Sequence, residues 1–339
     1  MPTKRQVVLT AAVLLLALAA MNLSIVYLTR NSMPRRVMRR ARESQSASVL
    51  ALGNSLVAAG FDETAFDTGA GLSFPDGAAN LGIGATTPVE HFLLFRYARA
   101  HGMRPRLVIY GFYDFQLTAP IQLTTSDVIG NHAMLYYLEP FYARQFYSLS
   151  LHDAFQFRTM HGIPMFAERG AIWAKIEFLR RAISQQGMPP ERTTRLGRAA
   201  DFSLLESANA EDFRRQCEAS MNLPLAPPVN EMLRQAYDAG FTIAVVEMPM
   251  RQAHRKLFYD TTWWPLYVEH IRNLLAPYHV IYVNASGWFQ DDSPFDDPLH
   301  LSAGGAAQFS GRLGSLLKPY SQNLSAHSAA ASEPGSSRP

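Results

Sequence analysis

The chain has 339 residues, of which 48% are hydrophobic and 17% charged, as in a packed protein of one large or two smaller domains. Its formal net charge of +3, without a basic run interleaved with aromatic residues, argues against a nucleic-acid partner. The single cysteine, Cys217, excludes an intramolecular disulfide and a cysteine-based zinc site.

The N-terminal segment predicts a membrane anchor. Residues 7–28 carry no charge and are long enough to cross a bilayer as one helix, and Lys4 and Arg5 precede them. The sequence Ala17-Leu18-Ala19 offers a cleavage pattern, but the apolar run continues well past it. This favours an uncleaved transmembrane signal-anchor over residues 1–30 rather than a removed signal peptide.

A basic juxtamembrane tether, residues 31–47, follows the anchor. The positive-inside rule would hold this side of the membrane in the cytoplasm. Alternatively, the tether is an amphipathic segment that rests on anionic headgroups, which leaves the opposite orientation open. The arginines concerned are Arg30, Arg35, Arg36, Arg39, Arg40 and Arg42.

Beyond residue 47, apolar runs with strand character alternate with helical periodicity. Strands are predicted at 48–52, 78–84, 105–111, 241–246 and 279–283, and the main helices at 88–102, 229–239, 265–275 and 303–317. This order predicts an α/β fold: a three-layer α/β/α sandwich with a central parallel five-stranded sheet, in a domain of residues 48–319. Residues 118–228 are interpreted as a helical insertion, and 320–339 as a disordered tail.

Two short segments at opposite ends of this domain contain the parts of a nucleophilic triad. Leu52-Gly53-Asn54-Ser55-Leu56 places a serine just after a predicted strand, and Asp297-Pro298-Leu299-His300 places a carboxylate three residues before a histidine. In such a triad the histidine takes the hydroxyl proton and the acid holds its tautomer. Alternatively, Ser55 caps a helix N-terminus and His300 is a surface residue.

Together the two segments resemble the opening and closing blocks of the SGNH (GDSL-like) hydrolases and acyltransferases. The resemblance covers residues 49–114 and 241–317 and implies a flavodoxin-like sandwich without a cofactor or metal. It implies that Ser55 is the nucleophile, His300 the general base and Asp297 the acid that orients it. Asp296 competes with Asp297 by proximity, but the spacing of the family selects Asp297.

The resemblance also implies an oxyanion site. Residues 80–86 are similar to the family's second block, with Gly84 as the expected N–H donor. The third block ends in Tyr113 and Asp114, so that a tyrosine stands where the family has an asparagine; it either donates to the oxyanion or packs as a rim aromatic. Asn54 replaces the aspartate that usually precedes the serine, and it keeps hydrogen-bonding capacity there.

The position of these residues in the predicted sheet supports a common site. Ser55, Gly84, Tyr113 and Asp114 all follow strands, and ligands of open parallel sheets bind at the carboxyl ends of the strands. Three further patterns are left open: the aspartates near 291–297 as a calcium site, the aromatic residues between 259 and 267 as a sugar-stacking surface or a helix seal, and His91 as a surface or capping residue.

The sequence therefore predicts a serine esterase or hydrolase that forms an acyl-enzyme on an ester substrate at the cell envelope. The first alternative is an O-acyltransferase that moves an acyl group from a donor to an exported polysaccharide or other envelope glycan. The second is a catalytically silent scaffold of an envelope assembly. The resemblance to anchored relatives favours the bacterial inner membrane with a periplasmic catalytic domain.

Overall fold

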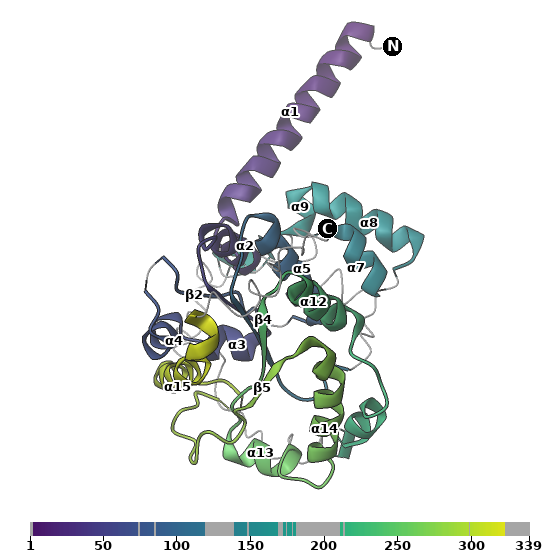
Figure 1. Ribbon diagram of the computed structural model, residues 1–339. Coiled ribbons are helices and arrows are strands. Elements are labelled where there is room, and N and C mark those ends of the chain that lie inside the picture. Colours follow the sequence, from purple (N-terminus) through teal and green to yellow (C-terminus); the bar gives the residue numbers. More distant parts are fainter. Residues whose placement is uncertain are drawn as a thin grey trace, which may run out of the picture. The chain divides into compact units, whose positions relative to one another are not determined.

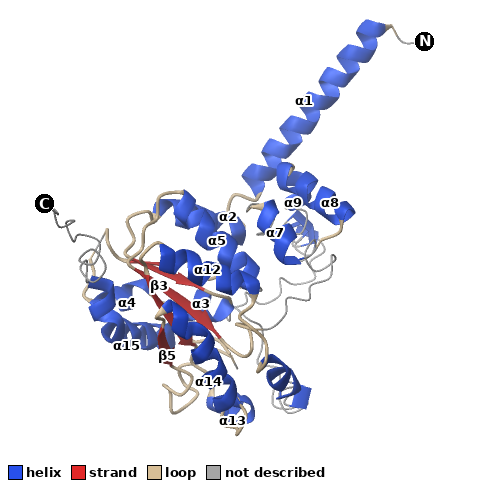
Figure 2. Ribbon diagram, turned by 45° about the vertical axis from the view of Figure 1, so that its right-hand side comes forward, coloured by secondary structure: helices blue, strands red, loops and turns tan. Residues whose placement is uncertain are grey.

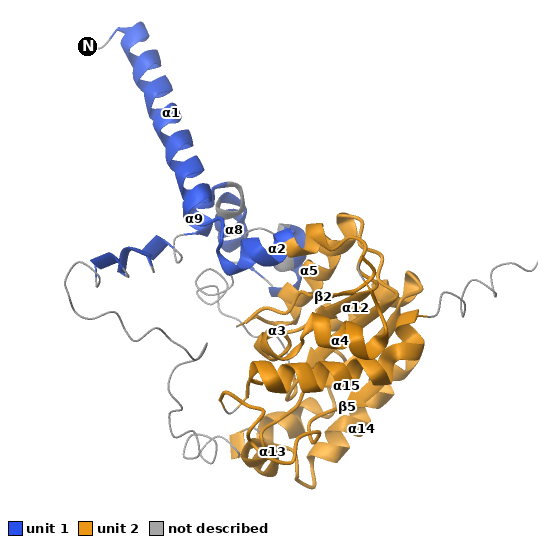
Figure 3. Cartoon of the chain, turned by 90° about the vertical axis from the view of Figure 1, so that its left-hand side faces the viewer, with its two compact units in different colours: residues 1–39, 122–195 blue, residues 40–121, 196–339 orange. Residues whose placement is uncertain are grey.

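The computed structural model describes residues 3–73, 75–84, 86–118, 139–147, 149–168, 172–173, 175–177, 179–180, 211–212, 214–297 and 299–322. The chain divides into two compact units, which are described separately (Figure 3). The first consists of Met1–Arg39 and Gln122–Arg195, and the second of Arg40–Ile121 and Leu196–Pro339.

The second unit contains a five-stranded sheet in which all neighbouring strands are parallel (Figure 2). The strand order β2-β1-β3-β4-β5 places the first strand of the chain inside the sheet. This confirms the predicted α/β class and the parallel five-stranded sheet. The strands are β1 (Val49–Leu52), β2 (Ala78–Asn80), β3 (Leu107–Phe112), β4 (Thr242–Glu247) and β5 (Ile281–Asn284).

The four main helices that the periodicity predicted are present, at Pro88–Ala100, Pro227–Asp238, Trp264–Leu275 and Ala303–Gln322 (Figure 1). The helices between β1 and β2 were not predicted. Two helix pairs make extensive contacts, α4 with α15 and α5 with α12. The helices of this unit include α3 (Ser55–Gly60), α4 (Glu63–Ala70), α5 (Pro88–Ala100), α12 (Pro227–Asp238), α13 (Gln252–Phe258), α14 (Trp264–Leu275) and α15 (Ala303–Gln322). Helix α15 continues past residue 320, where the tail was predicted to begin; residues 323–339 lie outside the described part.

The contact between α4 and α15 depends on glycine. A Cβ atom on Gly69 would lie 2.2 Å from the carbonyl oxygen of Gly311, and one on Gly314 would lie 2.3 Å from that of Phe66. The backbones of the two helices therefore touch, which no larger residue at these positions would allow. At the end of α15, the Gln322 side chain donates a 2.8 Å hydrogen bond to the carbonyl oxygen of Ala70.

The first unit is helical in its described residues. Helix α1 (Lys4–Leu28) is long and apolar enough to cross a membrane, as predicted. Helix α9 (Pro164–Ala167) contacts it, and the Met165 N–H donates to Asn22 Oδ1 at 3.2 Å. Arg35 Nε pairs with the buried Glu168 carboxylate at 2.6 Å. This unit also contains α7 (Pro140–Tyr147) and α8 (Leu151–Gly162), and α2 (Met33–Glu43) begins in it.

Candidate active site

Ser55 is the first residue of α3, directly after the turn that leaves β1. Asn54 is the N-cap of this helix, and its Oδ1 accepts a 2.9 Å hydrogen bond from the Leu56 N–H. The alternative in which Ser55 caps the helix is therefore wrong, because the cap is Asn54. The turn needs Gly53, since a Cβ there would lie 2.4 Å from Val57 Cγ2 and 2.7 Å from the carbonyl oxygen of Gly111.

Asn80, the last residue of β2, fixes the position of α3. Its Nδ2 donates to the carbonyl oxygens of Val57 at 3.0 Å and Phe61 at 2.8 Å, while its Oδ1 accepts from the Gly82 N–H at 2.8 Å. Gly82 lies directly on the helix, where a Cβ would be 2.5 Å from the Ala58 nitrogen. The loop after β2 and the helix that begins with Ser55 are thus held together. This bridging role of Asn80 was not predicted, because its partners lie about twenty residues earlier in the chain.

Asp297 and His300 form a hydrogen-bonded pair in the loop before α15. His300 Nδ1 lies 3.0 Å from each carboxylate oxygen of Asp297. Asp297 Oδ1 also accepts the backbone N–H groups of Leu299 and His300, each at 2.9 Å, which orients the carboxylate. The neighbouring Asp296 is exposed and donates its backbone N–H to the His300 carbonyl oxygen at 2.9 Å. The carboxylate at the ring is therefore that of Asp297.

Nε2, the other ring nitrogen of His300, is buried and has no hydrogen-bond partner in the part of the chain that the structure describes. Only 13% of the side chain is exposed, so His300 is not a freely solvated surface residue. A buried imidazole nitrogen without a hydrogen-bond partner lowers the stability of the folded protein, so Nε2 is a candidate functional group. Among the described residues, the side chain of Ser55 likewise has no hydrogen-bond partner.

Helix α3 connects the two candidates. Ser55 begins this six-residue helix, and the residue after His300 packs at its other end: a Cβ on Gly60 would lie 3.4 Å from Leu301 Cδ1. Ser310 of α15 donates to the carbonyl oxygen of Gly60 at 3.2 Å. The structure thus brings the segment that contains Asp297 and His300 to the helix that begins with Ser55. No hydrogen bond joins Ser55 to His300.

The loop after β3 contains Tyr113 and Asp114, both half-buried. Asp114 has φ 47°, a left-handed conformation that is uncommon for a residue other than glycine. Its N–H donates to the Tyr259 hydroxyl at 2.8 Å. Burial raises the pKa of the Asp114 carboxyl well above its usual range, and the charge of this carboxyl, with burial, raises the pKa of Tyr113. The Tyr113 hydroxyl therefore stays protonated and is able to donate a hydrogen bond.

Two other predicted site residues have different surroundings. Gly84 lies in the turn after β2, half-exposed. Asn54 is buried, and besides its cap its Nδ2 donates to Gln116 Oε1 at 3.5 Å, which ties the turn after β1 to the loop after β3. The amide of Asn54 is thus engaged in holding the loops.

The interpretation of His91 as a surface residue is wrong, because this side chain is only 2% exposed. Its Nδ1 lies 3.0 Å from the Tyr110 hydroxyl and its Nε2 lies 3.0 Å from Thr86 Oγ1. Thr86 in turn donates to the carbonyl oxygen of Ile83 at 2.7 Å. Burial lowers the His91 pKa to about 4, so the ring is neutral and braces the loop that contains Gly84.

The aromatic residues between 259 and 267 are mostly internal. Trp264, Tyr259 and Tyr267 are at most 4% exposed, which supports the sealing interpretation for these three. Trp264 Nε1 donates to the buried Glu247 carboxylate at 3.0 Å. A cavity of about 510 Å³ lies beside them, lined in part by Asp260, Glu269 and Arg272.

The acidic segment near residue 292 is occupied by contacts within the protein. Asp292 pairs with Arg251 Nε at 2.7 Å, and Asp291 accepts from the Ser293 hydroxyl at 2.6 Å. Among the described residues, no group of three or more histidine, cysteine, aspartate or glutamate side chains could hold a metal ion.

Comparison with known proteins adds no assignment: no model of a known family matches the chain, and neither does any curated protein.

Proposed function

We propose that the chain is a membrane-anchored serine hydrolase of the SGNH type, with a three-layer α/β/α catalytic domain, that forms an acyl-enzyme on Ser55. The observation that carries this proposal is the Asp297–His300 pair. His300 Nε2 is buried without a hydrogen-bond partner among the described residues, and the next residue, Leu301, packs on the helix that Ser55 begins. The five-stranded parallel sheet supports it as well, because Ser55, Gly84 and Tyr113 all follow the carboxyl ends of strands.

In the proposed reaction, Ser55 Oγ attacks the ester carbonyl carbon while His300 Nε2 takes the hydroxyl proton. Asp297 stabilises the imidazolium that forms. The tetrahedral intermediate then expels the alcohol, which leaves with the proton from His300. Water, deprotonated by the same nitrogen, attacks the acyl-enzyme and releases the acid and free Ser55. The expected oxyanion donors are the Ser55 N–H, the Gly84 N–H and the Tyr113 hydroxyl.

Transfer to a glycan is the second candidate, and one observation favours it. The 510 Å³ cavity is lined by aromatic and charged side chains, and Tyr259, one of them, bonds the backbone of Asp114 in the candidate oxyanion loop. A sugar hydroxyl bound there could replace water in the second step. In either case the apolar α1 supports an anchor in the inner membrane, and we propose that the catalytic domain lies on its periplasmic side.

A labelled fluorophosphonate tests the nucleophile in the full-length protein purified in detergent. We expect wild type to be labelled and Ser55→Ala to lose all labelling, whereas Ser293→Ala, which removes an exposed hydroxyl, keeps it. His300→Ala should slow labelling by about 10²-fold or more, because the base is lost. Labelling that survives in Ser55→Ala would reject the assignment.

Two further measurements separate the candidates. Time courses with an acetyl ester, with and without oligosaccharide acceptors, distinguish hydrolysis from transfer, and transfer that never exceeds hydrolysis excludes the transferase. The silent scaffold is tested by Ser55→Ala in the native host. A phenotype equal to that of the deletion, at normal protein level, excludes the scaffold.

A further inference from the structure

The helices of the first unit leave many large apolar side chains on its surface. Among the described residues of 149–180 there are six that are 40–77% exposed, whereas the whole described part of the second unit has four, none more than 56% exposed. Exposed apolar side chains in such number indicate a surface that meets a protein or a membrane. The six residues are Leu151, Phe155, Phe166, Trp173, Ile176 and Leu179.

The last three of these residues follow helical spacing. Trp173, Ile176 and Leu179 recur every third residue in a stretch whose described residues are helical, so they share one side of it. Lys175 and Arg180, both exposed, are interspersed with them. Aromatic and aliphatic side chains combined with lysine and arginine are typical of helices that lie at the surface of a bilayer.

Within the same unit, these helices pack against the C-terminal end of α1 (Figures 1 and 3). Helix α9 contacts α1, and α8 contacts α9. The Met165 N–H donates to Asn22 Oδ1 at 3.2 Å, and Lys175 Nζ donates to the carbonyl oxygen of Leu28, the last residue of α1. Ile25, between these two contacts, is buried. The exposed apolar residues therefore belong to helices that are attached to the apolar helix itself.

Asn22 gives the depth of this contact in a bilayer that α1 crosses. At a rise of 1.5 Å per residue, Asn22 lies about 9 Å from Leu28 along the helix, inside the uncharged run of residues 7–28. A backbone N–H at this depth has no water to bind, and Asn22 supplies the acceptor for Met165. Phe166, the next residue, is therefore at the level of the acyl chains. A water-soluble partner does not reach side chains at this depth.

We propose that α8, α9 and the described helical residues of 172–180 lie at the surface of the bilayer beside α1, and that Phe155, Phe166 and Trp173 insert among its acyl chains. The inference rests on the proposed anchor, because it requires that α1 cross the membrane. Trp173 is two residues from Lys175, which reaches the end of α1, and tryptophan is enriched at this boundary between acyl chains and headgroups. The first unit then binds the membrane through a surface as well as through one helix.

The test uses the full-length protein in vesicles of phosphatidylcholine and phosphatidylglycerol. In a Cys217→Ala background, Phe155→Cys and Trp173→Cys each carry one nitrobenzoxadiazole fluorophore. Leu266→Cys and Leu316→Cys are the matched controls, because both leucines are exposed and belong to the second unit. Quenching is measured with a phosphatidylcholine that is spin-labelled near the top of its acyl chain, and separately with iodide in the water.

We expect the lipid spin label to quench the fluorophores at Phe155→Cys and Trp173→Cys about threefold or more strongly than those of the controls, and iodide to quench them less. The proposal is overturned if either fluorophore is quenched by the lipid no more than the controls are. A fluorophore that is shielded from iodide and not quenched by the lipid would identify a protein partner, which also overturns it.

A label at Leu15→Cys, near the middle of α1, separates failure of the anchor from failure of this inference. No quenching there by the lipid overturns both, whereas quenching there but not at Phe155→Cys or Trp173→Cys overturns the inference alone. Fluorophosphonate labelling of Ser55 is independent of these outcomes.

Intrinsic fluorescence serves if a cysteine variant fails to fold. Trp173 belongs to the first unit, whereas the other three tryptophans, Trp263, Trp264 and Trp288, belong to the second. In vesicles of brominated phosphatidylcholine, a larger fraction of the tryptophan fluorescence should be quenched in wild type than in Trp173→Phe. Equal fractions would overturn the proposal.

Discussion

The buried His91 leads to a prediction about stability and pH. Its pKa is about 4 in the folded protein, because burial disfavours the charged ring, against an ordinary value of 6.5. Between pH 6.5 and pH 4, His91 is therefore protonated in the unfolded chain but remains neutral in the folded protein. The free energy of unfolding falls as pH decreases through this window, and a difference of about 2.5 pKa units corresponds to about 3 kcal/mol.

Replacing His91 by glutamine removes this titration while keeping a polar side chain near Tyr110 and Thr86. Between pH 4.5 and 6, we expect the free energy of unfolding of His91→Gln to depend on pH less steeply than that of wild type, by roughly 1 kcal/mol per pH unit. Urea unfolding followed by tryptophan fluorescence measures it, since Trp263, Trp264 and Trp288 lie in the sheet-containing unit. His152→Gln, at an exposed position of α8, should parallel wild type. Parallel curves for His91→Gln would refute a buried neutral ring.

Two predictions concern the candidate site. If the Tyr113 hydroxyl donates to the oxyanion, Tyr113→Phe should lower kcat of ester hydrolysis about 10- to 1,000-fold with little change in KM. A rate near that of wild type would show that Tyr113 only packs. Asn80→Ala removes two hydrogen bonds to α3 and its C-terminal end and one from Gly82. It should therefore lower the free energy of unfolding, measured in urea, by about 2–4 kcal/mol. A loss below about 0.5 kcal/mol would contradict the bridging role.

The centre of the sheet was predictable because β1 and β3 are buried along their whole length and β4 is buried from its second residue on. β3 and β4 are continuous apolar runs in the sequence, and the structure places their boundaries within two residues of the predicted ones. Helix α4 was not predicted, since Thr64, Thr68 and Gly69 are poor helix formers. Its stability comes from the Asp62 cap and from close packing on α15, a helix more than two hundred residues later.

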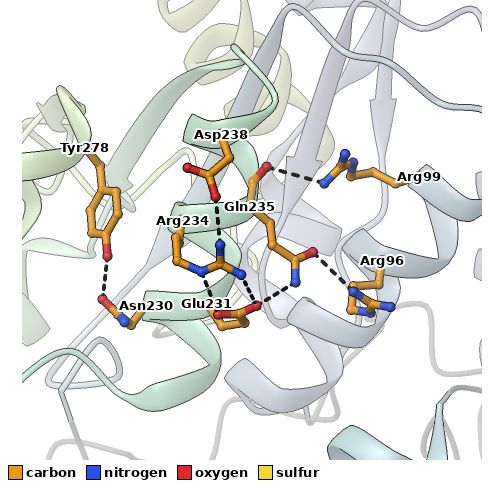
Figure 4. Close-up of polar contacts among 8 residues, drawn as sticks. All are labelled: Arg96, Arg99, Asn230, Glu231, Arg234, Gln235, Asp238 and Tyr278. Atoms are coloured by element: carbon orange, nitrogen blue, oxygen red, sulfur yellow. Dashed lines mark hydrogen bonds and ion pairs between the residues drawn. The ribbon is translucent and has the colours of Figure 1, made fainter.

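In the candidate site, too, the local contact was predictable from the sequence and the long-range contacts were not. The contact between Asp297 and His300 is local, three residues apart, and the motif was sufficient to predict it. The roles of Asn80 and His91 depend on partners in other elements, such as Val57 and Tyr110, which no spacing in the sequence reveals. The contact between α5 and α12 was missed for the same reason, because Gln235 of α12 accepts a hydrogen bond from Arg96 of α5 only in the folded chain (Figure 4).

The hydrogen bond from Ser310 to Gly60 joins residues 250 positions apart. A ribosome that adds about 5–20 residues per second needs roughly 12–50 s to make that stretch. Through this interval the nascent chain carries Ser55 on a helix whose neighbour, α15, has not been synthesised, and His300 arrives only just ahead of that helix. The surroundings of the candidate nucleophile are therefore completed among the last steps of translation. A chain interrupted before residue 300 contains Ser55 without its proposed base.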